Sequence, residues 1–478
     1  MTHANGPAPT ADAIRSIRDR AFARAAGSPL VPGNAVSILK DGAENYAAWL
    51  EAIATATRVI HFETYIIHGD EVGLQFAQTL AQQARRGVRV RCLCDWFGSL
   101  HVGAGRIWSL LIKAGAEVRW FNPLRIDRPF GWISRDHRKV ITIDGRTGFV
   151  SGLCVGRAWV GDAQRQVEPW RDIGVAIAGP AVADLDLAFA ETWAIAGTSL
   201  PPADLRERAA IATEGTVPVR VVAGTPIAAE LYRLDQFIAA SAQRSLWLTD
   251  AYFVGTTAYT QALKAAALDG VDVRLLVPGA SDVPVIRSIS RAGYRPLLES
   301  GIRIFEWNGT MLHAKAAVAD STWARVGSTN LNITSWMGNW ELDVAIEDEA
   351  FAKAMEAMYL DDLEHSTEVV LTPRQRVHLG ATPESPSRRA AHRQGQTRRA
   401  AAGVLGVGSA VGAAITNRRA LGPAEARVMG SAGMTLLLVT TALFVWPRGF
   451  AIPAAVLLGW VALALLARAV KLRFWGSP

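Results

Sequence analysis

Cysteine is scarce in this sequence, and its positions form no recognisable pattern. Three cysteines occur in 478 residues: Cys92, Cys94 and Cys154. So few cysteines exclude a disulfide framework, and their spacing is not that of a zinc site. Clusters of histidine and cysteine are also missing, as is a Walker-type Gly-Lys-Ser/Thr sequence. We therefore expect a reducing compartment, no metal ion and no cofactor.

The N-terminus lacks the apolar run of a secretory signal peptide, so delivery to a membrane must depend on a later segment. Residues 429–446 and 450–467 are charge-free spans of 18 residues each. A helix of that length measures about 27 Å, close to the thickness of a bilayer core. Arginine and lysine flank both outer ends, which predicts that these ends are cytoplasmic. We expect residues 429–478 to form a transmembrane hairpin, and the alternative is a hairpin buried in a soluble protein.

Acidic and basic residues are balanced over most of the chain, and the surplus of positive charge is local. The formal charge is +7, and residues 388–427 hold eight arginines against one acid, Glu425. This distribution argues against a broadly basic nucleic-acid-binding surface and favours anionic lipid headgroups as a local partner. The alternative to lipid binding is that residues 372–428 form a solvated basic linker without a partner. Within this segment, residues 401–416 form either an interfacial helix or a third membrane span.

The chain does contain an internal repeat. Residues 244–254, Arg-Ser-Leu-Trp-Leu-Thr-Asp-Ala-Tyr-Phe-Val, match residues 57–67, Thr-Arg-Val-Ile-His-Phe-Glu-Thr-Tyr-Ile-Ile. A Gly-Val-x-Val-Arg segment follows in each copy, and helical patterns at residues 46–56 and 73–86 precede the two predicted strands of the first copy. The repeat predicts a duplicated α/β unit.

Each half contains one His-x-Lys-x4-Asp sequence. The residues are His137, Lys139 and Asp144 in the first half and His313, Lys315 and Asp320 in the second. Chance would give on the order of 0.01 such matches in a chain of this composition. The chain has 7 lysines against 43 arginines, yet both motifs use lysine. A compact point charge of this kind suits a small tetrahedral phosphoryl group.

The second motif continues into a Gly-Ser-Thr-Asn sequence at residues 327–330. If residues 312–319 are extended, His313 and Lys315 leave the same face of a strand. Residues 323–326 would then form the return strand and deliver Ser328 beside the starting point. This arrangement is typical of a phosphate site.

A phosphodiester is negatively charged, so a metal-free enzyme needs cations and hydrogen-bond donors around its oxygens. The residues suited to this task are Lys139, Lys315, Ser328 and Asn330. One histidine can attack phosphorus as a neutral imidazole while the other protonates the leaving alcohol. Each histidine also needs a carboxylate to fix its tautomer. Asp172 and Glu341 stand at matching places after the two motifs.

These motifs resemble those of the phospholipase D superfamily, whose signature is His-x-Lys-x4-Asp followed by Gly-Ser/Thr-x-Asn, and the resemblance covers residues 36–371. Three segments are also similar to bacterial cardiolipin synthases of this type: Thr-Asp-Ala-Tyr-Phe-Val at 249–254, Leu-His-Ala-Lys at 312–315 and Trp-Arg-Asp at 170–172. The resemblance implies two tandem, pseudo-symmetric α/β/α sandwich domains. It also implies transfer of a phosphatidyl group between lipid alcohols through a phosphohistidine.

The resemblance further predicts the partners and the location. Phospholipids and the membrane are the expected partners, and no nucleic acid is expected. The expected location is the bacterial plasma membrane, with the catalytic domains in the cytoplasm. By analogy with the superfamily, His137 is the nucleophile and His313 the acid and base, so both are expected to be essential.

The second half matches the superfamily pattern at every position, whereas the first half departs from it. Cys154 stands where the superfamily usually has Asn, and Gly152 stands where it has Ser, Thr or Gly. We therefore expect the first half to bind the phosphoryl oxygens less strongly, or with backbone donors alone.

Three other functions remain open. A phospholipase D that hydrolyses phospholipids to phosphatidic acid would use the same residues, with water in place of the alcohol. A nuclease or other phosphodiesterase of the superfamily would need a more basic catalytic region. A non-catalytic membrane scaffold would tolerate the loss of both histidines.

Composition and repeats divide the chain into parts with different expected roles. Residues 1–34 form an N-terminal arm whose basic amphipathic helix, residues 11–26, either lies on a membrane or packs on a domain. The remaining parts are a first domain at 35–198, a linker at 199–217, a second domain at 218–371, the basic linker at 372–428 and the hairpin at 429–478.

Overall fold

The computed structural model describes residues 11–100, 102–124, 133–226, 228–371 and 377–379, with isolated positions between 434 and 463. Apart from these isolated positions and residues 377–379, the predicted basic linker, its apolar stretch at 401–416 and the predicted hairpin lie outside the described residues. Within the described part of the chain, no helix combines the length and the apolar character needed to cross a membrane.

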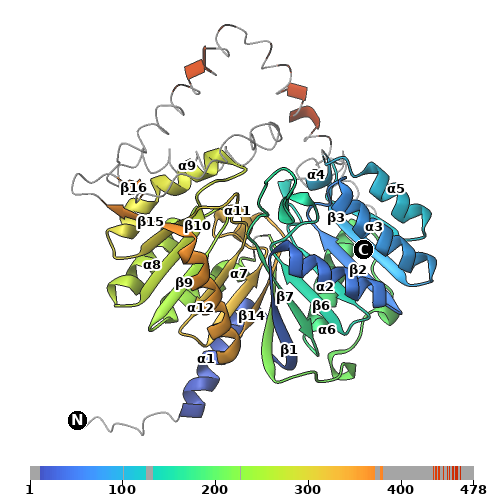
Figure 1. The fold of residues 1–478 in the computed structure, drawn as a ribbon, viewed down its shortest axis with the longest axis horizontal. Helices are drawn as coiled ribbons and strands as arrows, with labels where there is room; N and C mark the ends of the chain where they lie inside the picture. The colour runs from blue at the N-terminus through green and yellow to red at the C-terminus, as the bar shows by residue number, and fades with distance from the viewer. Residues whose placement is uncertain are drawn as a thin grey trace.

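The first half follows the predicted order of strands and helices (Figure 1). Its elements are β1 (Val31–Lys40), α2 (Asp41–Thr55), β2 (Val59–Thr64), α3 (Glu71–Arg85), β3 (Arg89–Asp95), α4 (Trp96–Ser99), α5 (Gly105–Lys113), β4 (Glu117–Phe121), β5 (Val140–Ile143), β6 (Thr147–Ser151), η2 (Arg157–Trp159), β7 (Ile173–Ala178) and α6 (Val182–Ala196). The carboxylate of Asp70 accepts a hydrogen bond from the amide of Gly73 at 3.0 Å and so caps α3. Gly87, at φ +91°, makes the turn into β3, where an L side chain would be strained.

The second half repeats this order after two short 3-10 helices, η3 (Pro202–Asp204) and η4 (Arg208–Ala210). Its elements are β8 (Val217–Gly224), α7 (Glu230–Ser241), β9 (Ser245–Thr249), α8 (Thr257–Leu268), β10 (Asp272–Pro278), α9 (Pro284–Ala292), α10 (Tyr294–Leu298), β11 (Arg303–Trp307), β12 (Ala316–Ala319), β13 (Trp323–Gly327), α11 (Ile333–Met337), β14 (Glu341–Ile346), α12 (Glu349–Glu364), β15 (Ser366–Leu371) and β16 (Val377–Leu379). The predicted return strand after the second motif is β13.

The strands of both halves form one sheet with a pseudo-twofold arrangement. From the middle outward, the first half runs β1-β7-β6-β5-β2-β3-β4 and the second runs β8-β14-β13-β12-β9-β10-β11. These two series correspond strand by strand, which confirms the duplicated α/β unit. Strands β15 and β16 extend the sheet in the second half alone.

The halves join where β1 pairs antiparallel with β8. Val31 lies opposite Val219, and Asn34 lies opposite Val217. The buried Asn34 amide donates to the carbonyls of Val31 (2.8 Å) and Val217 (3.1 Å) and accepts from the amide of Ala181 (2.8 Å). A buried polar group satisfied by both halves fixes how the two edges meet.

Helices cover both faces of the sheet, as the predicted α/β/α sandwich requires. Helices α2, α3 and α5 cover one face of the first half, and α7 and α8 cover the corresponding face of the second. On the other face, α6 and α12 contribute to a third apolar cluster that contains strands from both halves. Because each large apolar side chain in such a cluster stabilises the fold by about 1.5–3 kcal/mol, this shared cluster ties the halves together.

Helix α1 (Ala11–Ala26) coincides with the predicted amphipathic helix. Near its end, Phe22 and Ala26 are buried against the second half. The ring of Phe22 lies 4.6 Å from that of Phe237 in α7, and the guanidinium of Arg220 lies 5.9 Å from the Phe22 ring centroid. This end of the helix therefore packs on the second half.

Candidate active site

The two histidine motifs lie where each half contacts the other. The amide of His137 donates to the carbonyl of Trp340 at 2.8 Å, and the amide of His313 donates to the carbonyl of Arg171 at 2.7 Å. The predicted extended segment at 312–319 becomes a regular strand only at β12, because the preceding residues bridge to the first half. The backbone of each motif is therefore held by the opposite half.

The carboxylate that contacts each histidine also comes from the opposite half. Nδ1 of His137 lies 2.9 Å from Oε2 of Glu341, and Nδ1 of His313 lies 2.8 Å from Oδ2 of Asp172. A carboxylate acceptor fixes the imidazole proton on Nδ1 and leaves the Nε2 lone pair available for chemistry. Sequence reasoning named these two carboxylates, but it did not predict this exchange.

Burial lowers the pKa of both histidines. For His137, the attraction of Glu341 opposes this shift and Lys139 adds to it. For His313, burial and the positive charge of Lys315 together lower the pKa to about 3. The positive charge of the lysine in the other motif also lowers the pKa of each histidine. The two motifs are therefore close enough to interact electrostatically. Both imidazoles are neutral at neutral pH.

The two lysines concentrate positive charge beside the imidazoles. Nζ of Lys139 donates to the carbonyl of His137; Nζ of Lys315 donates to that of His313 and lies 3.1 Å from its Nδ1. Burial lowers the pKa of Lys315 to about 8, because Asp172 offsets only part of the desolvation and Lys139 repels its charge. An anionic ligand would offset this repulsion and favour the charged form of Lys315. The site therefore suits a phosphodiester.

The second half offers side-chain donors and acceptors in the loop after β13. Oγ of Ser328 donates to Oε2 of Glu341 at 2.6 Å, and the amide of Leu331 donates to Oδ1 of Asp250 at 2.8 Å. Asn330 is 4% exposed, and its Oδ1 has no hydrogen-bond partner among the described residues. Leaving a buried amide oxygen unbonded is unfavourable, so this group is available to a ligand.

The first half is built differently at the matching positions. A Cβ at Gly152 would lie 2.3 Å from Oδ1 of Asp172, so no side chain fits there. Cys154 is buried in the apolar cluster beneath α2, where its carbonyl accepts from the hydroxyl of Tyr46 at 2.6 Å. The indole Nε1 of Trp159 donates to Oδ2 of Asp172 at 3.0 Å and thus takes the role that Ser328 has in the second half.

The structure does not bring Asp144 and Asp320 to the histidines, and their catalytic role stays a prediction. Each lies about 16 Å along its strand beyond the motif lysine. The carboxylate of Asp144 accepts from the amides of residues 57–59 at 2.7–2.9 Å, and that of Asp320 accepts from the amides of residues 243–245 at 2.7–3.2 Å. Their φ angles are 55° and 54°. They stabilise the turns at the far end of each strand.

Aromatic rings enclose the imidazoles, and sequence reasoning did not assign them to the site. The ring of Tyr65 lies 5.1 Å from that of His137, and Tyr252 lies 5.9 Å from His313. These two tyrosines occupy matching places in the internal repeat, so the repeat carried a signal for them. Trp159 packs edge-on against His313 at 5.6 Å, and its counterpart in the repeat is not aromatic.

The assembled groups can carry out a displacement at phosphorus in two steps. One neutral imidazole can attack through Nε2 while the other exchanges a proton with the leaving or entering alcohol. The lysines, and Asn330 through the N–H groups of its Nδ2, can donate to the non-bridging oxygens as charge develops. Among the residues that the structure describes, no group of three or more His, Cys, Asp or Glu side chains could hold a metal ion.

Comparisons with known proteins agree with this arrangement. The family described as "Cardiolipin synthase, PLD-like domain" matches residues 49–160 and 236–363. Cardiolipin synthase A of Pseudomonas fluorescens (strain SBW25) is 34% identical over 358 residues, which is 73% of this chain and 73% of that protein. Cardiolipin synthase of Geobacillus kaustophilus (strain HTA426) is 34% identical over 346 residues, 71% of this chain and 68% of its own length.

A solved structure supports the same fold. Phosphatidylserine synthase of Haemophilus influenzae Rd KW20 superposes with a TM-score of 0.58 at 15% identity, covering 73% of this chain and 91% of that one. The sequence matches, which extend over both histidine motifs, show that this chain belongs to the family of phospholipase D-like cardiolipin synthases.

Proposed function

We propose that the protein is a phosphatidyltransferase that joins phosphatidylglycerol-type lipids to make cardiolipin or a related diester. The observation that carries this proposal is the exchanged pairing of His137 with Glu341 and of His313 with Asp172. It supplies two oriented imidazoles at one site, one for each of the two roles that transfer through a covalent intermediate requires. The named activity of the curated relatives supports the choice of lipid substrate.

The first step forms a phosphohistidine. Nε2 of His137 attacks phosphorus, the bond from phosphorus to the alcohol oxygen breaks, and His313 donates a proton to the leaving glycerol. In the free site the pKa of His313, about 3, is too low for a general acid. A bound phosphodiester offsets the charges of Lys139 and Lys315 and so raises that pKa toward the working range.

The second step transfers the phosphatidyl group. The hydroxyl of a second lipid loses its proton to His313 and attacks phosphorus, and the bond to Nε2 of His137 breaks. Lys139, Lys315, Ser328 and Asn330 stabilise or orient the phosphoryl oxygens in both steps, and Gly152 leaves room for Asp172 against β6. Water in place of the second lipid would give hydrolysis instead of transfer.

The C-terminal segment anchors the enzyme to the plasma membrane, with the catalytic domains at 35–198 and 218–371 on the cytoplasmic side. The charge-free spans at 429–446 and 450–467 and their flanking arginines and lysines support this part of the proposal. At the isolated described positions between 434 and 463, the backbone is helical and the large apolar side chains are exposed, Val445 by 77%. Retention of the protein in membranes washed at high salt, and its release after deletion of residues 429–478, would test the anchor.

The activity is tested with the purified full-length protein and phosphatidylglycerol in detergent. Transfer produces one glycerol for each cardiolipin, whereas hydrolysis produces phosphatidic acid and no cardiolipin. A primary alcohol added to the reaction separates the two reactions further, since only a transferase converts it efficiently to a phosphatidyl ester. If neither cardiolipin nor glycerol appears, the proposal fails.

The covalent step is tested by rapid acid-free quenching and mass spectrometry of the protein. We expect a phosphatidyl group on His137 during turnover. If the phosphatidyl group is found on His313 instead, His313 is the nucleophile and His137 is the acid and base, and the overall reaction is the same. A variant with His137→Asn should show no adduct at that position.

A further inference from the structure

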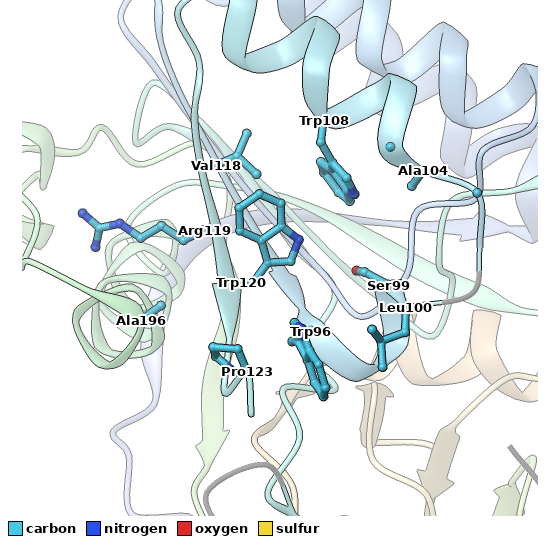
Figure 2. A pocket seen from close by; sticks show the side chains of 12 residues that line it. Trp96, Ser99, Leu100, Ala104, Trp108, Val118, Arg119, Trp120, Pro123 and Ala196 are labelled. Atoms are coloured by element: carbon cyan, nitrogen blue, oxygen red, sulfur yellow. The ribbon is translucent and has the colours of Figure 1, made fainter. Parts of the chain in front are cut away.

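A cavity of about 670 Å³ lies in the first half at the ends of β3 and β4. The tryptophans that line it are Trp96, Trp108 and Trp120. Figure 2 shows the rings of Trp108 and Trp120 facing the cavity, and their centroids are 6.2 Å apart. The guanidinium of Arg119 turns away and lies 3.9 Å from the Trp193 ring centroid. The space is open to solvent on one side and is lined mainly by aromatic and apolar surface.

The walls of this cavity continue into the segment that holds His137. Asp95 directly precedes the lining residue Trp96, and its Oδ2 accepts from the amide of Asp136 at 3.0 Å. On the other side, Phe121 follows Trp120, and its ring lies 5.9 Å from that of Trp340. The carbonyl of Trp340 in turn accepts from the amide of His137. His137 is therefore connected to the cavity wall through Asp95 and Asp136 on one side and through Phe121 and Trp340 on the other.

Large apolar side chains are exposed around the same region. Leu100, which lines the cavity, is 43% exposed, while Leu124 and Ile133 are 54% and 58% exposed. Leu124 follows the lining residue Pro123, and Ile133 lies in the segment that leads to His137. An apolar rim beside an aromatic cavity favours an apolar ligand.

Among the residues that the structure describes, the space at the end of β10 in the second half is much smaller. The space at the end of β10 holds only about 10 Å³, because Tyr252, Ile286 and Tyr294 close it. The open cavity is therefore a property of one half and not a consequence of the shared fold. The cavity therefore makes the first half, which holds His137, different from the second half, where Tyr252 lines the smaller space.

We propose that this cavity binds a hydrocarbon chain of one phospholipid substrate while the phosphodiester of that lipid lies at the histidines. The inference rests on the proposed function and adds a subsite to it. Each methylene that leaves water for such a cavity strengthens binding about fourfold. Rings of tryptophan suit this task because they offer a large, rigid apolar surface near a lipid boundary.

A substitution that fills the cavity tests the subsite through chain length. Gly105 lines the cavity, and a Cβ there would meet nothing within 4 Å. We expect Gly105→Trp to raise the KM for dioleoyl phosphatidylglycerol about tenfold with little change in kcat. The KM and kcat of the Gly105→Trp variant for dihexanoyl phosphatidylglycerol should each change less than about twofold. Leu268→Trp is the control, because Leu268 is 73% exposed on α8.

Chemical labelling tests occupancy without catalysis. The three native cysteines are buried, so Leu100→Cys introduces an exposed thiol at the rim. Monomeric dioctanoyl phosphatidylglycerol should slow the reaction of this thiol with a maleimide about tenfold, whereas glycerophosphoglycerol should have no effect. Leu268→Cys should label at the same rate with and without lipid.

The two measurements separate failure of the subsite from failure of the proposed function. Protection of Leu100→Cys by the lipid supports the subsite, whatever the activity of the wild-type protein. Failure of the wild-type protein to transfer either substrate would count against the proposed function alone. Unchanged labelling with lipid, or equal protection by glycerophosphoglycerol, would overturn the subsite. Equal KM values of Gly105→Trp and wild type for both chain lengths would also overturn it.

Discussion

The two halves of the molecule share a strand order and a His-Lys pair, but they surround their histidines with different groups. The second half presents Ser328 and the unbonded amide of Asn330. The first half has Gly152 and Cys154 at those positions and uses the indole of Trp159 instead. Both halves retain an oriented imidazole and a nearby cation, which the proposed mechanism needs twice. The groups that differ between the halves would be needed only once, for example to contact a single set of phosphoryl oxygens.

The largest effect is expected where the halves are equivalent. His137→Ala and His313→Ala should each reduce transfer about 10⁴-fold or more, because one imidazole cannot serve both as nucleophile and as acid and base in the same step. Cardiolipin formation from phosphatidylglycerol measures the loss. The urea unfolding midpoint of each variant serves as the control for folding. Loss of only a few-fold in one variant would show that the halves are not equivalent in chemistry.

The exchanged carboxylates should give the next largest effect. Glu341→Gln and Asp172→Asn each keep the shape of the side chain but remove the charge that fixes the histidine tautomer. We expect a fall in kcat of about 10²–10⁴-fold in each, even though Glu341 lies in the second half and serves His137 in the first. The double variant Glu341→Gln with His137→Ala should be no worse than His137→Ala alone. Additive losses would contradict the pairing.

The asymmetric pair Asn330 and Cys154 should respond unequally. Asn330→Ala should lower kcat about 10²-fold, since it removes the Nδ2 donor that can hydrogen-bond to the phosphoryl oxygens. Cys154→Ala should lower kcat less than about threefold, because the thiol packs in the apolar cluster beneath α2. Steady-state kinetics with phosphatidylglycerol compares the two. A similar fall in kcat in both variants would mean that the first half binds the phosphoryl group through Cys154 or the loop that contains it.

The smallest effect on activity is expected at Asp144 and Asp320, where both halves use a carboxylate to hold a turn. Asp144→Asn and Asp320→Asn should each lower the free energy of unfolding by about 1–3 kcal/mol, while kcat stays within about threefold of wild type. Urea titration and steady-state kinetics measure the two effects. A 10²-fold fall in kcat without loss of stability would support the predicted catalytic role.

The stability effect at Asp144 should depend on pH. Burial raises the pKa of Asp144, but hydrogen bonds from the Val59 and Thr57 amides and the Thr57 hydroxyl outweigh it and lower the pKa below the ordinary value. A lowered pKa in the folded state means that the stabilisation is complete above the unfolded pKa of about 3.9 and is lost as pH falls through the folded pKa. The difference between wild type and Asp144→Asn should therefore shrink below about pH 4.

Sequence patterns predicted the parts of this structure that depend on local signals. The internal repeat around Tyr65 and Tyr252 predicted the duplicated strands. The spacing of His313 and Lys315 predicted a shared site, because neighbouring positions in a chain constrain each other directly.

Other features depend on contacts between distant segments and left no local pattern. The pairing of His137 with Glu341 joins residues separated by 204 positions. The carboxylate of Asp144 binds amides more than 80 positions earlier, so its spacing from His137 resembled that of a catalytic residue. Trp159 belongs to one half only, and a repeat cannot reveal a group that it does not contain.

The exchange of carboxylates between halves also affects when the enzyme can first act. His137 leaves the ribosome 204 residues before Glu341, which at typical rates of synthesis is about 10–40 s. During that interval the first half has its imidazole but not the group that orients it. In the proposed mechanism, a nascent chain already near lipid therefore cannot start the reaction before the second half has been made and has docked. Synthesis itself would then delay the onset of activity until the whole catalytic region is present.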